Sequence, residues 1–356
     1  MKTIFISEGW RMLKRRYSGP SMKFEGDAKE ICTKIVERCW NGRYFQTSLG
    51  HFSEFWMRDF GWSTESLMRL GYKEEIKKTL EYALDKFEKH GSVTTTISPG
   101  GKCFNFPYYA PDSLGYLIHS LYLLNDKEFV LKHRKFLNSQ ISFFYNEVID
   151  VRTGLVKKYK IFSSMRDHSI RKSSCYDNCV VARMAREIQE LKLYNPFTAD
   201  YEKLIEDHYW NGEFFYDDSR KENKFIADSN IIPFVFGVVK DKDKLKKVID
   251  KIIKNKLDLP IPLRYTNKSN EKQHWTSKLV SGYETTAVWT HMGPMYIKLV
   301  KSVDVKLYKD YLKEYSNFIE KNKNYLEGFD EKGNPFESYV YKADEGMIWA
   351  ANYLTL

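Results

Sequence analysis

Acidic and aromatic residues gather in short motifs that flank apolar helical stretches along most of the chain. The motifs lie at residues 55–59 (Phe-Trp-Met-Arg-Asp), 111–113 (Pro-Asp-Ser), 165–169 (Met-Arg-Asp-His-Ser), 176–178 (Tyr-Asp-Asn), 289–294 (Trp-Thr-His-Met-Gly-Pro) and 326–330 (Leu-Glu-Gly-Phe-Asp). A sugar ring stacks its apolar face on an aromatic side chain, while its hydroxyls need charged hydrogen-bond partners. The motifs therefore predict a carbohydrate ligand.

Asp167 and Glu327 are the candidate catalytic carboxyls. Cleavage of a glycoside with inversion needs one protonated carboxyl for the leaving oxygen and one carboxylate, roughly 6.5–9.5 Å away, that activates water. Both acids stand in long loops beside aromatic residues or arginine, and we expect these loops at the same end of the fold. Asp167 is the predicted general acid and Glu327 the predicted general base. Glu337 and then Glu284 are the alternatives for the base.

The residues expected to hold the sugar are acids, arginines and aromatics near these carboxyls. They are Trp56, Arg58, Asp59, Asp112, Arg166, Tyr176, Asp177, Glu284, Trp289 and Glu337. Structural explanations compete with this interpretation. Arg58 and Asp59 could form a buried pair at a helix start, and Asp112 and Asp177 could be helix caps.

Asp167 has an alternative of its own. It could pair with Arg166 or Arg171, two arginines in the same loop. An ion pair would depress the pKa of its carboxyl, and a general acid must keep its proton near neutral pH. The environment of Asp167 therefore decides its role.

Two further classes of function stay open. His51, His168, His274 and His291 would suit a sugar epimerase or isomerase that uses histidines as acid and base, and two of them fall in the motif loops. A barrel that binds a glycan or a protein without catalysis is the other class, because a fold alone does not fix an activity.

The elements that must position these residues are predominantly helical. Apolar residues recur at three- and four-residue spacing, which predicts helices over 28–41, 60–71, 73–90, 112–124, 126–148, 177–193, 198–208, 229–239, 242–255, 283–300, 306–322 and 345–356. Uniformly apolar helices alternate with lysine-rich amphipathic ones. An inner ring of buried helices wrapped by an outer ring explains this alternation, so we predict an all-α fold, an (α/α)6 toroid of six hairpins.

The domain prediction is an irregular N-terminal arm over residues 1–27 and a single barrel domain over 28–356. The formal charge is +10, but most lysines belong to mixed-sign helices that are typical of a solvated surface, so we expect neither a nucleic-acid nor a membrane partner. The apolar run at residues 4–6 is too short for a signal peptide, so we expect none, and no stretch approaches about 20 apolar residues. The five cysteines match neither a disulfide framework nor a zinc site. A cytoplasmic protein without a metal or organic cofactor is expected.

The ordered motifs resemble those of the six-hairpin glycosidases. The branch of processing α-glucosidases and trehalases is the most similar, and glucoamylases and glycogen-debranching domains are more distant. Residues 55–59 look like the Trp-x-Arg-Asp segment that holds the terminal sugar, 165–171 resemble the general-acid segment Gly-x-Asp-Asn-Ser-Pro-Arg, and 326–335 resemble the general-base loop. Residues 228–234 and 288–294 are similar to two helix-entry motifs of the same branch.

The resemblance covers about residue 52 to residue 356. It implies an inverting hydrolase that acts on an α-linked, glucose-containing oligosaccharide, with Asp167 as acid and Glu327 as base. Two departures stand at functional positions: Arg-Asp-His replaces the usual Gly-x-Asp-Asn around Asp167, and Thr-His replaces the arginine that usually precedes Gly293 and Pro294.

Overall fold

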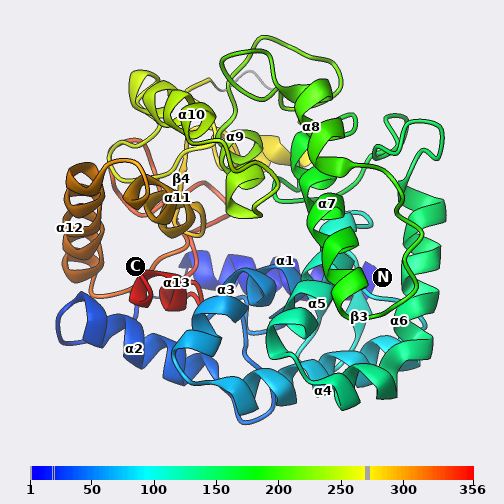
Figure 1. The fold of residues 1–356 in the computed structure, drawn as a ribbon. Coiled ribbons are helices and arrows are strands. Elements are labelled where there is room, and N and C mark those ends of the chain that lie inside the picture. Colours follow the sequence, from blue (N-terminus) through cyan, green and yellow to red (C-terminus); the bar gives the residue numbers. More distant parts are fainter. Residues whose placement is uncertain (1, 18, 20, 269–272) are drawn as a thin grey trace.

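The computed structural model describes residues 2–17, 19, 21–268 and 273–356, and helices dominate it. Within the described ranges, the twelve α-helices from α2 to α13 form two concentric sets (Figure 1). The inner set is α3 (Met57–Arg69), α5 (Pro111–Leu124), α7 (Cys175–Glu190), α9 (Ala227–Val235), α11 (Met292–Lys301) and α13 (Ala350–Leu354). The outer set is α2 (Ala28–Cys39), α4 (Lys73–His90), α6 (Lys127–Val148), α8 (Tyr201–Tyr209), α10 (Lys242–Lys254) and α12 (Val305–Asn322).

The inner helices form a closed ring. Each contacts the next in the order α3, α5, α7, α9, α11 and α13, and α13 returns to contact α3. The outer helices α4, α6, α8, α10 and α12 each pack against an inner helix that precedes them in the chain, and α2 packs against α13. The predicted (α/α)6 toroid is therefore confirmed.

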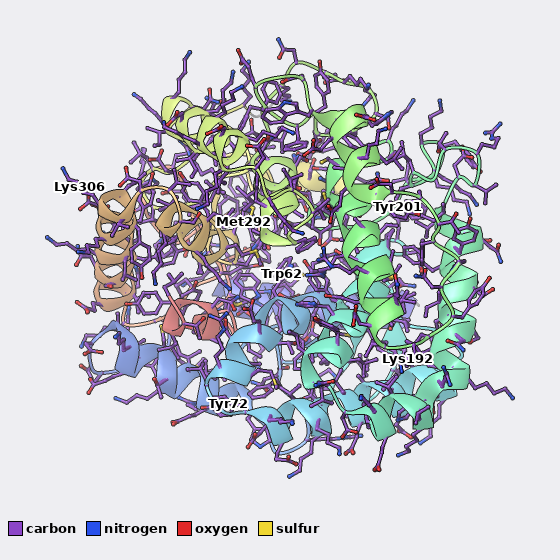
Figure 2. The ribbon with its side chains drawn as sticks, viewed as in Figure 1. Trp62, Tyr72, Lys192, Tyr201, Met292 and Lys306 are labelled. Atoms are coloured by element: carbon purple, nitrogen blue, oxygen red, sulfur yellow. The ribbon has the colours of Figure 1, made fainter. Side chains whose placement is uncertain are left out.

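Burial explains which helices lie inside. Nearly every residue of α5 is buried, whereas α10 buries only Leu245, Val248, Ile249 and Ile252, which lie along one face. Figure 2 shows Trp62 near the centre of the ring and Lys306 of α12 at its periphery. Uniformly apolar helices need neighbours on all sides, and a closed ring with an outer layer supplies them.

Glycines let the inner helices approach closely. A Cβ atom on Gly61 of α3 would lie 2.4 Å from the Cβ of Tyr116, and one on Gly115 of α5 would lie 2.4 Å from a methyl carbon of Val180. Real carbon atoms do not come this close in a packed interior. The close contacts from α3 to α5 and from α5 to α7 therefore require a residue without a side chain at positions 61 and 115.

The two sets of helices begin differently. The outer helices α2, α6, α8, α10 and α12 each start after an aspartate whose side chain accepts a backbone N–H. Among the described helices, the inner α3, α5, α9, α11 and α13 have no such side-chain cap. Several candidate site residues occupy these inner helix starts instead.

Two small sheets lie among the loops at the end of the barrel where the inner helices begin. Strands β1 (Phe55–Trp56), β2 (Thr96–Ile97) and β3 (Cys103–Phe104) form one antiparallel sheet directly before α3. Strands β4 (Val288–Trp289) and β5 (Gly328–Phe329) form the other and pair Trp289 with Gly328. The second sheet carries Glu327 to the start of α11, although the two segments are far apart in the sequence.

The predicted irregular arm over residues 1–27 is wrong for most of its length, because Lys2–Tyr17 forms helix α1. Met12 packs against the small cluster of Ala287, Phe336, Tyr341 and Ala343, and Arg15 pairs with Glu345 at 3.1 Å. These contacts from distant loops stabilise a helix that its own sequence predicts only weakly. In Figure 1, α1 passes behind the inner helices.

Two predicted helix boundaries are also wrong. The helix expected over 283–300 begins only at Met292, because Val288 and Trp289 pair with β5 instead. The helix expected over 345–356 is limited to Ala350–Leu354. In the part of the chain that is described, no helix is both long and apolar enough to cross a lipid bilayer.

Candidate active site

A cavity of about 520 Å³ lies at the end of the ring where the inner helices begin. Asp59 at the start of α3, His291 before α11 and Trp349 before α13 line it together with loop residues. The predicted site residues in its lining are Trp56, Arg58, Asp59, Asp167, Glu284, Trp289 and Glu327. The structure thus brings the two candidate catalytic carboxyls into one cavity.

Asp167 is held by a guanidinium and a hydroxyl. Nη1 of Arg58 lies 3.3 and 3.4 Å from its carboxylate oxygens, and the Ser163 hydroxyl donates a short hydrogen bond to it. The Asp167 side chain keeps 18% of its surface exposed. It is therefore anchored and yet accessible to a ligand.

Arg58 links Asp167 to a second carboxylate. Its Nε donates to Asp112 at 2.6 Å and its Nη2 at 3.3 Å, and the Tyr176 hydroxyl also donates to Asp112 at 2.9 Å. Asp112 and Tyr176 are buried and do not belong to the cavity lining. Their positions indicate that they hold the guanidinium of Arg58 in place and do not contact a ligand in the cavity.

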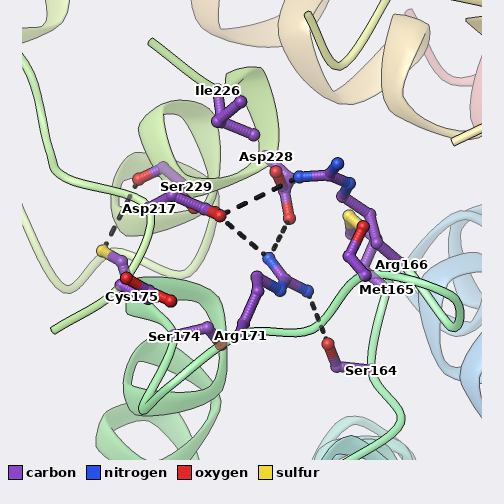
Figure 3. A network of polar contacts seen from close by, with 12 residues as sticks. Ser164, Met165, Arg166, Arg171, Ser174, Cys175, Asp217, Ile226, Asp228 and Ser229 are labelled. Carbon is purple, nitrogen blue, oxygen red and sulfur yellow. Dashed lines mark hydrogen bonds and ion pairs between the residues drawn. The ribbon is translucent and has the colours of Figure 1, made fainter. Parts of the chain in front are cut away.

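The other two arginines of the loop face a buried acidic cluster (Figure 3). Arg171 pairs with Asp228 at 2.7 Å and with Asp217 at 3.4 Å, and a guanidinium nitrogen of Arg166 lies 3.9 Å from Asp217. Burial alone would raise the pKa of Asp217, but the guanidiniums of Arg171 and Arg166 outweigh it and lower that pKa. The arginine that pairs with Asp167 is thus Arg58 and not Arg171.

Glu327 has a different set of neighbours. The Tyr283 hydroxyl donates to Oε1, while the Tyr341 hydroxyl at 2.5 Å and the Asp344 backbone N–H at 2.8 Å donate to Oε2. The residue is 2% exposed. Burial raises the pKa of Glu327, and the nearby His51 and the phenolic hydrogen bonds only partly offset this. Both carboxylate oxygens are aligned by donors that leave no ambiguity in orientation.

Glu284 lies on the Asp167 side of the cavity. Its two carboxylate oxygens accept the His168 backbone N–H at 2.9 and 3.0 Å. Burial raises the pKa of Glu284, His168 lowers it, and the nearby Asp167 adds to the increase. Glu284 therefore fixes the turn that follows Asp167, which is a positioning role.

Asp59 and His291 complete the cavity floor. Burial raises the pKa of Asp59 to about 7, and Trp349 donates its indole N–H to that carboxyl at 3.0 Å. The imidazole of His291 stacks on Trp62 at 4.2 Å with an interplanar angle of 3°. Burial, and then the charge of Arg58, lowers the pKa of His291 well below its usual range, so this imidazole is neutral.

The remaining predicted residues do not line the cavity. Arg166 is buried and donates to the Glu284 carbonyl at 3.2 Å. Asp177 is buried in the first turn of α7, where the Ser174 hydroxyl donates to it at 2.6 Å. Glu337 is 42% exposed and pairs with Arg16 at 3.7 Å and Lys342 at 3.5 Å. These positions fit structural roles.

Sequence reasoning missed the two phenols on Glu327 and the contribution of α1. Tyr283 directly precedes Glu284, and Tyr341 follows Glu337 by four residues, so a search for aromatics near candidate acids would have found both. Within the described residues, no group of three or more His, Cys, Asp or Glu side chains is placed to hold a metal ion.

No protein-family profile and no curated protein matches the chain at a significant level. Solved structures with the same fold are similar to it. A GH63 mannosylglycerate hydrolase from Thermus thermophilus in complex with Tris has 12% identity and a TM-score of 0.64, over 92% of this chain and 98% of that one. A rhamnosidase from Klebsiella oxytoca with rhamnose bound has 11% identity and a TM-score of 0.63, over 95% and 65%.

A bacterial glucoamylase complexed with acarbose is another such structure. It has 13% identity and a TM-score of 0.66, over 91% of this chain and 54% of that one. These proteins are six-hairpin glycosidases on an (α/α)6 barrel, which is the fold of the present chain. At 11–13% sequence identity, the similarity to these structures establishes the fold alone.

Proposed function

We propose that the protein is an inverting glycoside hydrolase that cleaves an α-linked glucoside. One observation carries the proposal: two carboxyls from separate loops, Asp167 and Glu327, line a single cavity that also contains Trp56, Trp289 and Trp349. Stacking of a sugar on these indoles would leave its hydroxyls to Arg58, Asp59 and the acids. The glycosidases on the same fold support the reaction type.

In this proposal Glu327 is the general base. Three donors point at its carboxylate, so the anion is satisfied on both oxygens and cannot rotate away from a water molecule in the cavity. A base must be ionised to act. We therefore expect activity to fall as the pH drops through the raised pKa of Glu327.

Asp167 is the general acid and must carry a proton when the glycosidic oxygen leaves. Only Nη1 of Arg58 reaches Asp167, because Nε and Nη2 are engaged by Asp112. A sugar hydroxyl that accepts from Nη1 would draw this donor away from Asp167.

The assignment of the two roles is tested with substrates whose leaving groups differ. Fluoride leaves α-glucosyl fluoride without protonation, whereas methyl or octyl α-glucoside needs an acid. Asp167→Asn should lose about 10²–10⁴-fold on the alkyl glucosides and keep most activity on the fluoride, while Glu327→Gln should lose both. The reverse pattern would exchange the roles, and full activity in both variants would end the proposal.

The stereochemistry gives an independent test. Proton NMR of the first sugar released from an α-glucoside should show the β-anomer if the reaction inverts the anomeric centre. Release of the α-anomer would contradict a water molecule activated directly by Glu327.

A histidine-dependent epimerase is the second candidate. His168 and His291 both line the cavity, which is the observation that keeps this candidate open. Incubation of free sugars in deuterated water would show exchange at a ring carbon if an epimerase operated. Loss of that exchange in His291→Asn, with no hydrolysis of glucosides by the parent, would favour this candidate.

A further inference from the structure

The polarity of the cavity changes with depth. Five of its charged residues, Glu54, Arg58, Asp59, Glu284 and Glu327, are less than a tenth exposed, and only the Asp167 side chain, at 18%, reaches further out among the described acids of the lining. The partly exposed part of the lining contains six apolar side chains: Met12, Leu13, Phe52, Phe106, Val280 and Val340. Leu13 is the most open of these at 36%. We call these six side chains the apolar collar.

The apolar collar reaches the side from which a leaving group would depart. The Ser163 hydroxyl that donates to Asp167 also lies 2.9 Å from the Phe106 carbonyl oxygen, so Phe106 and the proposed acid share a neighbour. Pro107, the next residue, lines the cavity as well. The group bonded to the glycosidic oxygen must pass these side chains.

Helix α1 supplies Met12 and Leu13 to the apolar collar and is fixed by charge. Arg11 pairs with Glu54 at 2.9 Å, and Arg15 pairs with Glu345 at 3.1 Å. The apolar surface continues outward along the same helix, where Trp10 is 68% exposed. Leu13, which lines the cavity, and the exposed Trp10 stand three residues apart on this helix.

We propose that the substrate is a glycoside with an apolar leaving group, an alkyl or aryl chain, which the apolar collar binds. The proposal rests on the proposed function and narrows the oligosaccharide expected from the sequence. A second sugar in the apolar collar would lose water from its hydroxyls without gaining hydrogen-bond partners, which is unfavourable. An alkyl chain in the same place gains by leaving water.

Binding of non-hydrolysable pairs tests this proposal. Methyl and octyl 1-thio-α-D-glucopyranoside, each below its critical micelle concentration, are titrated into the full-length protein by calorimetry. The octyl compound should bind at least tenfold more tightly. Leu13→Asp should reduce the octyl-to-methyl ratio at least fivefold, and Val340→Asp should act in the same direction. Leu131→Asp is the matched control, because Leu131 on α6 is 59% exposed and lies outside the cavity lining.

Each outcome decides. Equal affinities for the two thioglucosides would overturn the proposal that the apolar collar binds the leaving group. So would a decrease of the octyl-to-methyl affinity ratio in Leu131→Asp as large as that in Leu13→Asp. An octyl tetraethylene glycol that binds as tightly as the octyl thioglucoside would also overturn it, since the sugar would then contribute nothing. If octyl binding depends on Leu13 while no glucoside is hydrolysed, the apolar collar stands and the proposed hydrolase fails.

Discussion

The two sides of the cavity hold their carboxyls by different means. On one side, Asp167 contacts the guanidinium of Arg58, and its loop rests on the buried ion pairs of Arg171 with Asp217 and Asp228. On the other side, Glu327 is held by two neutral phenols and a backbone N–H. Both arrangements fix a carboxylate in place, but only the first brings a full positive charge into direct contact with it.

The difference shows how one cavity separates the chemistry of two acids. The guanidinium that contacts Asp167 is charged and is shared with Asp112. Phenols and N–H groups are fixed and uncharged. They orient Glu327 while burial still raises its pKa. The two carboxyls thus differ in their partners: a shared guanidinium contacts Asp167, and neutral donors contact Glu327.

Breaking the ion-pair side should have the largest effect on stability. Arg171→Met leaves the buried Asp228 and the partly exposed Asp217 without their shared partner, and we expect the free energy of unfolding to fall by about 3–5 kcal/mol, chiefly through Asp228. Urea unfolding followed by far-ultraviolet circular dichroism measures it. Arg152→Met is the control, because that side chain is 82% exposed and pairs only with neighbouring Asp150. Equal losses would show that the buried pairs do not support the loop.

The Glu327 side depends on Asp344, whose backbone N–H donates to Glu327. Burial would raise the pKa of Asp344, but His51, the Ser48 hydroxyl and the Phe52 N–H lower it to about 2. The folded pKa is depressed, so the stability gained is complete above the ordinary aspartate pKa and is lost as the pH falls toward about 2. The stability difference between the parent and Asp344→Asn should therefore shrink by about 2 kcal/mol between about pH 5 and about pH 2. A constant difference in urea unfolding would contradict this.

Removal of the Tyr341 hydroxyl tests how far the neutral donors control the pKa of Glu327. Tyr341→Phe deletes a donor that favours the Glu327 anion, so the pKa of Glu327 should rise further. The acidic limb of the kcat/KM profile should move upward by about one pH unit. Tyr339→Phe, at a residue that is 94% exposed, should leave the profile unchanged. A downward shift in Tyr341→Phe would show that the phenol does not donate to an ionised base.

The smallest effect is expected at Glu337, the first alternative for the base. Its carboxylate is 42% exposed and bound to Arg16 and Lys342 outside the cavity lining. Glu337→Gln should keep kcat/KM on an alkyl glucoside within about twofold of the parent. A loss comparable to that of Glu327→Gln would move the general base to this residue.

The fold could be predicted from the sequence because its signal is local. The three- and four-residue spacing of apolar residues marks each helix, and the contrast between uniformly apolar and lysine-rich helices separates the inner ring from the outer one. The start of α11 could not be predicted. Tyr283 and Ala287 have the four-residue spacing of a helix, but Val288 and Trp289 pair with the distant Phe329 and Gly328 instead.

The two acids of the site could be predicted from the sequence, but the residues that contact them could not. Asp167 and Glu327 stand in recognisable motifs, and the structure places both in one cavity, where their roles stay predictions. The phenols of Tyr283 and Tyr341 reach Glu327 through loops that no periodic pattern describes. Helix α1 was missed for a related reason, since it is held by residues far along the chain, from Glu54 to Glu345.

The phenols that orient Glu327 also provide a built-in optical signal. Burial and the adjacent Glu327 carboxylate raise the pKa of Tyr283 and of Tyr341 well above the usual range for tyrosine. In alkali these two rings would ionise only once the cavity opens to water. The part of the slow near-ultraviolet phenolate absorbance that is lost in Tyr341→Phe after a pH jump would then report the opening of the cavity in unlabelled protein.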